Sequence, residues 1–547
     1  MKSIWIFIGV MTLVLIGCKS SKKSNMLEDE VFVKDVKTIK DNYDQMFLSG
    51  YKKKNDGGEG HLKLVNKGSH IVDNGLFFYS TKKGKIWQRI VGDTMTTLHY
   101  GIENSAKKDV TVRIQAMIEA AYRNSKSVIK FSEGNYLIGT LDFHPGVEFL
   151  GTKDTWLLKT PKSGKFDRMF RSKGNQYSST KNSKVLKFTD LNIDGQMDKQ
   201  GKHDEYELEH QQMIFLAAKQ KSKGRLQVEI DNCYFKNGVS DAIHIYHNVD
   251  AKITNCIAEN VFRGGVVVGG GSSSVEVKNF KAFGDIHVTG IDIEVDGRGY
   301  DGNYEVDVTM EDIFLAGDCD IAVKEGSFYG KNIICSGPPF YLASRHGKIF
   351  IEDSKFYSSS KKKGRILIPK DMHFKNCQFT YLDDGDTNNF LTEIFWSVKD
   401  HIGKNQKLHF EGCTFSIENH SGKKVTALKS LVDKDYRGNE FVVSNSKIDK
   451  EFAVGIHLTR GGVLNFMNSE NYAELPFRFN SVNKKNVYDF NYKVKIDKLK
   501  TSSDKQTIIE MKKDSRNTVE ILDTSVPMSA IKSTNNKKPS KAKRLNN

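Results

Sequence analysis

The chain has 547 residues, of which 38% are hydrophobic, 27% are charged and only 8 are proline. This apolar content excludes a wholly disordered chain, and a mean hydropathy of −0.49 without a long apolar run after residue 20 excludes a protein with several membrane spans. The 83 basic and 67 acidic residues give a net charge of +16, which favours an acidic partner through long-range attraction.

The first residues are typical of an export signal. Lys2 precedes an apolar stretch over residues 4–16 that is too short for a stable membrane span, and the stretch ends in Leu15-Ile16-Gly17-Cys18. This ending resembles a bacterial lipobox. The resemblance implies that residues 1–17 are a removed signal peptide, that Cys18 carries the acyl chains, and that residues 18–48 form a tether. We therefore expect an outer-membrane lipoprotein at the cell surface or on the periplasmic face. The alternative is a short membrane anchor with an incidental cysteine.

Residues 49–105 are expected to form a small N-terminal module, which a capping helix follows. Within residues 109–122, apolar residues recur at helical spacing. The residues that share this apolar face are Val110, Ile114, Met117, Ile118 and Ala121. Such a helix can cover the open end of a stack of strands.

A short repeat runs through the middle of the chain. Each copy has an Asn or Asp, then a small or apolar residue, then alternating residues, which is strand periodicity. The Asn or Asp positions are Asn232, Asn255, Asn279, Asp312, Asn332, Asp353 and Asn376, at successive intervals of 23, 24, 33, 20, 21 and 23 residues. A period in the twenties without intervening helices indicates a solenoid. We expect a parallel β-helix over residues 106–480, with on the order of a dozen coils and turn side chains hydrogen-bonded along the axis.

The ends and the cysteines of the repeat complete the predicted organisation. The repeat fades after residue 480, so residues 481–530 are expected to form a C-terminal capping region. Residues 531–547 are basic and polar, and are expected to be a disordered tail. Cys233, Cys256, Cys377 and Cys413 occupy one phase of the repeat. We expect them to be small inward-facing core residues and not disulfide partners.

Several segments carry a family resemblance. Phe131-Ser-Glu-Gly-Asn-Tyr-Leu-Ile-Gly139 and Gly146-Val-Glu-Phe-Leu-Gly151 follow the predicted helix. Together they resemble the opening of the pectate-lyase-like β-helix superfamily. Asp56-Gly-Gly-Glu-Gly60 and Trp87-Gln-Arg89 resemble the module that often precedes it, and Gly290-Ile-Asp-Ile-Glu294 is similar to a motif common in these proteins. The resemblance implies an all-β, right-handed, single-stranded parallel β-helix. It leaves the reaction open, because the superfamily includes polysaccharide lyases, glycoside hydrolases, epimerases and phage-type adhesins.

Aligned strands place polar side chains in rows on the outer face. We align residues 242–246, 265–269, 290–294, 319–324 and 340–344 with their apolar residues inward. His244 and Asp292 then share one outward row, and Tyr246, Glu294 and Lys324 share the next. Further polar residues flank these strands, with Asp241 and Arg263 before them and His247, Asp296, Arg345 and His346 after them. His210 precedes a further strand at 213–216 at a similar phase to Asp241 and Arg263. Gly264, Gly265, Gly269, Gly270 and Gly271 leave one coil without side-chain bulk, which suggests a groove. The alternative is that these charges are ordinary solvated surface.

This set of residues suits β-elimination on the uronic acid residues of an anionic polysaccharide or of its oligosaccharides. We expect the polysaccharide to come from marine algae. Elimination needs a base for the C5 proton, a group that neutralises the carboxylate, and an acid for the departing oxygen. Lys324 or His244 is the expected base, Arg263 the carboxylate clamp, and Tyr246 or His210 the acid. The expected substrate-binding residues are His247, Glu294, Arg345 and His346. No cofactor is certain, although a calcium ion held by Asp292, Glu294 and Asp296 could replace the clamp.

Other functions remain open at this stage. The same chemistry could remove water from a terminal uronate, which resembles the dehydrating step in bacterial breakdown of ulvan. Glu294 and Asp296 resemble the Glu-x-Asp pair of the β-helical iota-carrageenases, which favours an inverting hydrolase of a sulfated or acidic glycan. The Gly-Pro-His motif of that family is missing, because the chain reads Cys319-Asp-Ile-Ala-Val-Lys-Glu-Gly326 there. A non-catalytic glycan-binding protein or adhesin is a further alternative, against which the 4 Trp residues argue. We expect a monomer and no nucleic-acid partner, since no recognised binding motif occurs.

Overall fold

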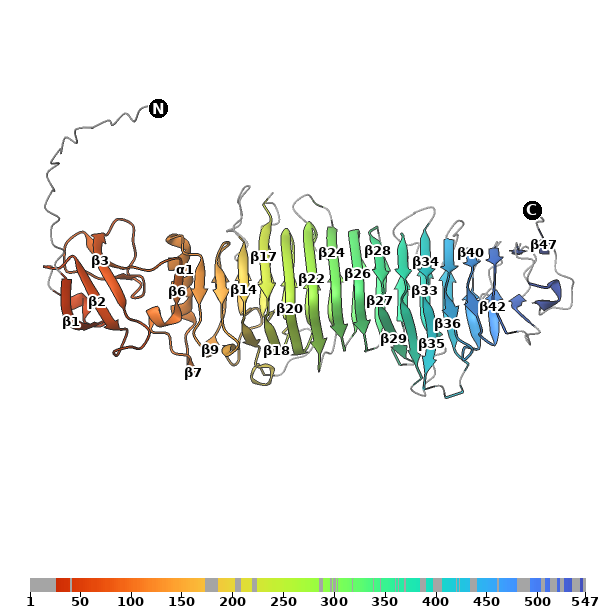
Figure 1. Ribbon diagram of the computed structural model, residues 1–547, viewed down its shortest axis with the longest axis horizontal. Coiled ribbons are helices and arrows are strands. Elements are labelled where there is room, and N and C mark those ends of the chain that lie inside the picture. The colour runs from red at the N-terminus through yellow and green to blue at the C-terminus, as the bar shows by residue number, and fades with distance from the viewer. Residues whose placement is uncertain are drawn as a thin grey trace, which may run out of the picture. The chain divides into compact units, whose positions relative to one another are not determined.

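The structure is a computed structural model, and Figure 1 shows its chain trace. It describes residues 26–39, 42–172, 185–201, 208–218, 224–284, 289–295, 298, 302, 304–316, 318–337, 339–344, 346–359, 361–362, 364–367, 370–383, 390–396, 406–419, 421–422, 424–432, 440–459, 462–479, 492–502, 507–511, 519–521, 526–533 and 542–544. The predicted signal peptide and the lipidation site Cys18 lie outside the described residues. Within the described part, no helix is long and apolar enough to cross a membrane.

The chain divides into two compact units, of which the first comprises residues 1–91 and 98–101. Its five strands are hydrogen-bonded in the order β1-β2-β3-β5-β4. Their bounds are β1 (Met26–Phe32), β2 (Gln45–Gly50), β3 (Gly60–Asn66), β4 (Phe77–Phe78) and β5 (Lys85–Arg89), with short 3-10 helices at Val36–Thr38 and Thr97–Tyr100. Apolar side chains such as Met46, Leu62 and Trp87 form its core. Arg89, from the Trp87-Gln-Arg89 motif, is buried and donates to the carbonyl oxygens of Gly75 and Gly58 at 2.8 and 3.0 Å.

The second unit covers residues 92–97 and 102–547, and all but one pair of its described strands form a parallel β-helix. The predicted all-β fold is therefore confirmed. Its fifteen-stranded sheet contains, in spatial order, β10 (Leu141–Phe143), β13 (Phe170–Ser172), β16 (Ile214–Leu216), β19 (Ile243–Ile245), β21 (Gly264–Val268), β23 (Thr289–Glu294), β25 (Cys319–Val323), β27 (Phe340–Ser344), β30 (Gly364–Leu367), β33 (Phe390–Trp396), β36 (Thr426–Val432), β39 (Val454–Leu458), β42 (Leu475–Phe479), β44 (Ile509–Met511) and β46 (Ile531–Ser533). Each coil contributes one strand to it (Figure 1).

The twenty-five-stranded sheet supplies the other two faces of each coil. Its strands are β6 (Thr94–Thr96), β7 (Ser105–Asp109), β8 (Val128–Lys130), β9 (Gly134–Ile138), β11 (Glu148–Leu150), β12 (Thr155–Lys159), β14 (Leu186–Thr189), β15 (Asn192–Asp194), β17 (Leu226–Asp231), β18 (Tyr234–Gly238), β20 (Val249–Val261), β22 (Ser273–Phe283), β24 (Glu305–Leu315), β26 (Glu325–Cys335), β28 (Lys348–Glu352), β29 (Lys355–Ser359), β31 (Met372–Lys375), β32 (Gln378–Leu382), β34 (Lys407–Glu411), β35 (Thr414–Glu418), β37 (Glu440–Ser444), β38 (Lys447–Ile448), β40 (Gly462–Met467), β41 (Glu470–Asn471) and β43 (Tyr492–Asp497). In β20, β22, β24 and β26 a single long bent strand spans both of these faces. In the preceding coil the same two faces are formed by the separate strands β17 and β18, which both pair with β20. A separate pair joins β45 (Val519–Ile521) to β47 (Ala542–Arg544).

The bend between the first two faces is made by the repeated Asn and Asp residues. All seven positions of the sequence repeat have a positive φ, between 50° and 58°, which Asn and Asp tolerate better than other residues with a side chain. Their side chains also bond along the axis, since Asn279 Nδ2 donates to Asn255 Oδ1 at 2.8 Å and Asn332 Nδ2 to Asp312 Oδ1 at 2.9 Å. The predicted ladder of turn side chains is confirmed.

This ladder makes a stability prediction. Replacing Asn332 by alanine should lower the free energy of unfolding by about 1–2 kcal/mol, because a β-carbon without a polar group is strained at φ 51° and the bond to Asp312 is lost. Replacing Asn332 by glycine should cost clearly less, because glycine adopts this φ freely and loses only the bond. Denaturant titration of both variants measures the difference, and equal losses would show that the conformation does not matter.

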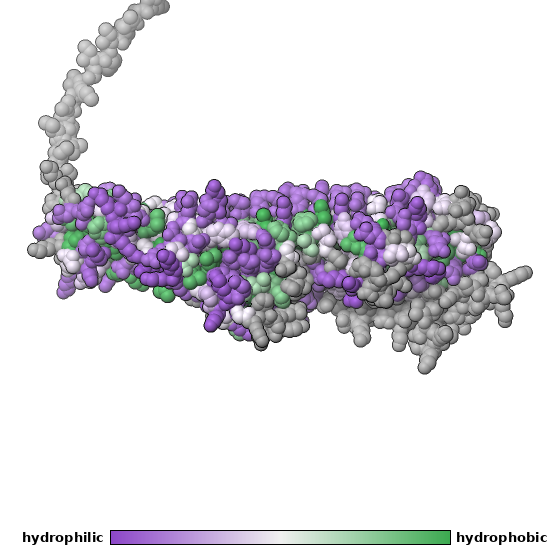
Figure 2. Space-filling view, turned by 90° about the horizontal axis from the view of Figure 1, so that it is seen from below, coloured by the Kyte–Doolittle hydropathy of each residue, from purple (hydrophilic) through white to green (hydrophobic). Residues whose placement is uncertain are grey.

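Inward side chains of successive coils stack into a continuous core. Phe374 lies over Phe410 and Phe379 over Phe415, with ring centroids 5.2 and 5.3 Å apart. The six cysteines among the described residues are buried and free, as predicted for the four of the repeat. On the outside, hydrophilic residues dominate the visible face of the described coils, as Figure 2 shows. At the first coil, α1 (Thr111–Arg123) buries Ile114 and contacts β8 and β10, so the predicted helix is present.

The coils continue further than the sequence repeat predicts. β43 pairs with β40, and β44 and β46 extend the fifteen-stranded sheet beyond β42. Residues 481–530 therefore include two more strands of the β-helix sheets, β43 and β44, besides β45 of the separate pair. The segment that was expected to be disordered contains the strands Ile531–Ser533 and Ala542–Arg544. Lys498 explains why the repeat is hard to see here. It takes the positive φ of 52° at the position next to Asn468, so the Asn signature is missing although the bend is present.

Candidate functional site

The fifteen-stranded sheet carries the predicted polar residues on its outer side. His244 of β19 pairs with Val267 of β21, Val267 pairs with Asp292 of β23, and Asp292 pairs with Asp320 of β25. Tyr341 of β27 follows Asp320 in the same row. The prediction that His244 and Asp292 share a row is confirmed, with Val267 of the glycine-rich coil between them.

Lys324 is not in the row in which the alignment predicted it. Ala322, and not Lys324, is the residue of β25 that pairs with Glu294. Lys324 lies two residues further along the chain. A shift of two residues leaves every apolar side chain inward, and the hydrophobic pattern therefore cannot detect it. Lys324 Nζ lies 4.6 Å from the ring centre of Tyr304. The backbone N–H of His346 donates to the carbonyl oxygen of Lys324 at 2.6 Å, so these two predicted residues are neighbours.

A buried carboxylate orients His244. Asp241 precedes β19 and is only 3% exposed, and its Oδ2 lies 2.8 Å from His244 Nδ1. Because a carboxylate oxygen accepts this hydrogen bond, Nδ1 carries the hydrogen and Nε2 of the neutral ring keeps a lone pair. Arg263 lies beside Asp241, with Nε 3.9 Å from Oδ1, and donates from its guanidinium to Glu209 Oε2 at 3.2 Å. The arrangement is a His–Asp dyad supported by a cation.

Gly269 keeps the second nitrogen of His244 uncovered. A β-carbon at Gly269 would lie 3.2 Å from His244 Nε2 and 3.5 Å from Tyr246 Cδ2. The side chain of His244 is 18% exposed. Aromatic rings border it, with the ring centroids of Phe215 and Tyr246 at 5.4 and 6.2 Å from that of His244. The imidazole is thus fixed on one side and accessible at Nε2.

Three carboxyl groups lie on β23 and β25 beyond the Val267 position. Burial, together with Asp320, Glu294 and Asp241, raises the pKa of Asp292 well above its ordinary range, although the nearby Arg263 opposes this. Burial, then Glu294 and Asp318, raises the pKa of Asp320 to about 7. The Oδ1 atoms of Asp292 and Asp320 are buried and have no hydrogen-bond partner among the described residues. The raised pKa of Asp292 favours the protonated form of this carboxyl group, which can donate a hydrogen bond.

The other predicted histidines are near the dyad but are held differently. His210 Nε2 lies 3.2 Å from Glu209 Oε1, and its ring stacks on Phe166 with centroids 5.1 Å apart. Burial and nearby cations, Arg168 first, lower the pKa of His210. Burial lowers the pKa of His247, whose ring centroid is 4.5 Å from that of Tyr246. Both imidazoles are therefore mostly neutral at pH 7.

Two predicted site residues, Asp296 and Arg345, lie outside the described residues. The calcium set of Asp292, Glu294 and Asp296 is therefore described only for its first two members, and it stays a prediction. Of these two, Asp292 is half-buried and Glu294 is exposed on the outer side of β23.

Sequence reasoning assigned no chemical role to three residues that shape this site. Asp241, Glu209 and Asp320 contribute carboxylates, whereas the open space at Gly269 lies in the glycine-rich coil where a groove was expected. Asp320 could have been found from the sequence, because the correct register places it directly beside Asp292. Glu209 lies 54 residues before Arg263, and no local pattern indicates that contact.

Solved structures with a similar fold are parallel β-helix proteins. The A-module of mannuronan C-5 epimerase AlgE4 from Azotobacter vinelandii has a TM-score of 0.40 and 13% identity, covering 78% of this chain and 99% of that one. WceF from Pantoea stewartii, a glycan biofilm modifying enzyme with a tailspike-like fold, has a TM-score of 0.37 and 14% identity over 65% of this chain. The alignment spans about half, 48%, of WceF. The catalytic domain of a GH87 alpha-1,3-glucanase in complex with nigerose has a TM-score of 0.37 and 11% identity, covering 82% of this chain and 72% of that one.

The similarity is one of fold. No family model and no curated protein matches the sequence.

Proposed function

We propose that the protein is a carbon–oxygen lyase that acts by β-elimination on uronic acid residues of an anionic glycan. The product is either a cleaved chain or a dehydrated non-reducing end. The observation that carries the proposal is the His244–Asp241 pair with an uncovered Nε2. A hydrogen-bonded carboxylate fixes the orientation of an imidazole and directs its other ring nitrogen toward the substrate side, which is what removal of a carbon-bound proton requires. The net charge of +16 favours an anionic substrate.

The proton and the electrons can be followed through the step. His244 Nε2 takes the C5 proton, the electron pair forms the C4–C5 double bond, and the C4–O bond breaks. The departing oxygen then needs a proton. Tyr246 is better placed to give it than His210, because the lowered pKa of His210 leaves that ring mostly unprotonated at pH 7. Lys324, the other predicted base, lies against Tyr304.

Neutralising the uronate carboxylate is the second requirement of the reaction. The raised pKa of Asp292 favours its protonated form, which can donate a hydrogen bond to a carboxylate and would thereby lower the pKa of the C5 proton. The Arg263 guanidinium adds positive charge near Asp292. Arg263 also contacts Glu209 and Asp241, so its main effect in this proposal is to position the dyad. A calcium ion at Asp292 and Glu294 stays an alternative to these donors.

The experiment that tests the proposal is a glycan assay with two readouts. Purified protein is incubated with alginate, pectate and ulvan fragments, and absorbance of a 4,5-unsaturated uronate is recorded beside the formation of new reducing ends. Rising absorbance supports elimination. New reducing ends without absorbance would support hydrolysis, and binding without either product would support a non-catalytic glycan-binding protein.

Hydrolysis is the second candidate because of one observation. Asp292 and Asp320 are directly paired on β23 and β25, and burial is the largest cause of the raised pKa of each, which is about 7 for Asp320. A protonated and an ionised carboxyl group are the two parts of a glycosidase. The predicted pair of Glu294 and Asp296 stays a prediction, because Asp296 lies outside the described residues. The His–Asp dyad has no role in that mechanism, which is why elimination is preferred.

Gly269 provides a prediction specific to the uncovered nitrogen. Replacing Gly269 by valine should lower turnover on the order of a hundredfold, because the new side chain occupies the space in front of His244 Nε2. The φ of Gly269 is not positive, so valine adds no backbone strain there. Gly92→Ala is the matched control, since a β-carbon at Gly92 meets nothing within 4 Å. Full activity of Gly269→Val would show that the substrate does not approach this nitrogen.

A further inference from the structure

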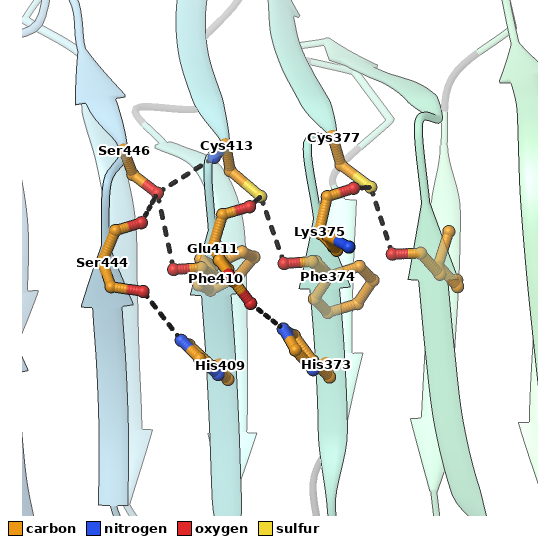
Figure 3. Close-up of polar contacts among 11 residues, drawn as sticks. His373, Phe374, Lys375, Cys377, His409, Phe410, Glu411, Cys413, Ser444 and Ser446 are labelled. Carbon is orange, nitrogen blue, oxygen red and sulfur yellow. Dashed lines mark hydrogen bonds and ion pairs between the residues drawn. The ribbon is translucent and has the colours of Figure 1, made fainter.

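Two histidines and a glutamate meet on a different face of the β-helix from the dyad. His373 lies on β31, and His409 and Glu411 lie on β34, both in the twenty-five-stranded sheet. One ligand atom from each of the three lies within 4.8 Å of the other two, and all three side chains are half-buried. Figure 3 shows them pointing out from neighbouring strands. Among the described residues, no second group of three His, Cys, Asp or Glu meets this criterion.

The solenoid itself brings these residues together. His373 pairs with His409 in register, and their rings stack with centroids 4.4 Å apart and planes 12° apart. Glu411 is two residues after His409 and so points to the same side of the strand. Its Oε2 lies 3.0 Å from His373 Nε2, which crosses from one coil to the next (Figure 3). His409 Nε2 lies 2.9 Å from Ser444 Oγ of β37.

We propose that His373, His409 and Glu411 bind a divalent transition-metal ion, with Zn²⁺ as its reference ion. Imidazole nitrogen and carboxylate oxygen are the ligands that Zn²⁺ takes, at about 2.0–2.2 Å. Three ligands at these distances must lie about 3–3.5 Å apart, so the 3.0 Å pair already fits. His409, whose Nε2 lies 2.9 Å from Ser444 Oγ, must turn its side chain to bring a ring nitrogen from within 4.8 Å to this distance. Water completes the coordination, because the side chains of His373 and Glu411 are 30% and 36% exposed.

The surroundings allow this ion to bind. Lys375 pairs with Glu411 in register and is the cation most directly beside the site. Lys407 is engaged by Glu440, with Nζ 3.6 Å from Oε2. The ion would join the coils of β31 and β34, and it would stabilise the folded chain as any ligand specific for the folded state does.

The test uses the full chain purified without a polyhistidine tag and treated with a chelator. Co²⁺ is titrated while its visible absorption is recorded, and Zn²⁺ is then titrated by calorimetry. We expect one saturable site per chain and a higher melting temperature with Zn²⁺. His373→Ala, His409→Ala and Glu411→Gln should each weaken Zn²⁺ binding roughly tenfold or more, because each removes one ligand.

Control variants separate this site from general binding of metal to surface histidines. His457→Ala removes an outward-facing histidine on β39 of the other sheet and should leave Zn²⁺ affinity unchanged. Lys375→Gln keeps all three ligands and should bind at least as tightly as the natural chain. Melting curves without metal verify that each variant folds. Absence of a saturable site, or equal affinity of the natural chain and the His373→Ala and His409→Ala variants, would overturn the proposal, whatever the outcome of the glycan assay.

Discussion

Replacing His244 by glutamine should lower turnover of the uronate substrate by about 10²–10⁴-fold, which is the range that a positioned general base contributes. Glutamine can still donate to Asp241, but it has no basic nitrogen where Nε2 stands. Because the side chain lies on the outer side of the sheet, the melting temperature should change by no more than a few degrees. The measurement is the rate of appearance of the unsaturated uronate.

Asp241→Asn tests the same dyad from its other side. The amide can present its NH₂ group to His244 Nδ1, which would move the hydrogen to Nε2 and remove the lone pair from the substrate side. Turnover should therefore fall on a similar scale although the imidazole remains. His457→Gln, on β39 of the same sheet, is the control and should retain full activity. A His244→Gln variant with natural activity would exclude His244 as the base.

Replacing Asp320 by asparagine should change how stability depends on pH. The pKa of Asp320 is about 7 in the folded protein and 3.8 in the unfolded chain, so between these values the folded state holds a proton that the unfolded state has lost. Stability should therefore fall as pH rises from about 4 to about 7, and then remain level. A shift of about 3 units corresponds to at most about 4 kcal/mol.

Asparagine cannot ionise, so the Asp320→Asn variant should lose this dependence of stability on pH. Asp320→Asn should equal the natural protein near pH 4 and melt at a higher temperature above pH 7, where the natural carboxylate is charged and buried beside Asp292 and Glu294. Melting curves between pH 4 and pH 8 measure the difference. Asp371→Asn alters an exposed carboxyl group and serves as the control. If Asp320→Asn has the same pH profile as the natural chain, Asp320 is not protonated at neutral pH.

The fold was predictable because its signal is repeated. The same requirement, a residue that tolerates positive φ at the bend, recurs from Asn232 to Asn376, and every recurrence adds weight to the period. Where that signal is absent, prediction failed. Lys498 occupies the same bend with a side chain that no pattern associates with it, and the strands at 492–497 and 509–511 were therefore assigned to a cap.

The face of the β-helix on which the site lies was predictable, but not all the contacts between its residues were. Strand periodicity alone puts His244 and Asp292 on the outer side, and successive coils align them. Registers that differ by two residues bury the same apolar set, so Lys324 was placed beside Glu294, where Ala322 lies. Contacts such as Arg263 with Glu209 depend on a loop before β16, and loop conformation has no periodicity from which it could be derived.

The glycine-rich strand β21 determines how far the dyad stands from the carboxyl pair. His244 and Asp292 belong to strands on either side of it, so two inter-strand steps of about 4.8 Å separate their backbones. In a solenoid this separation can change only by whole coils, because removing part of a coil would break the hydrogen-bonded ladder. A natural variant with one more or one fewer coil here would hold the base and the carboxyl groups of Asp292 and Asp320 at a different distance along the glycan, while variation within the loops would leave that spacing untouched.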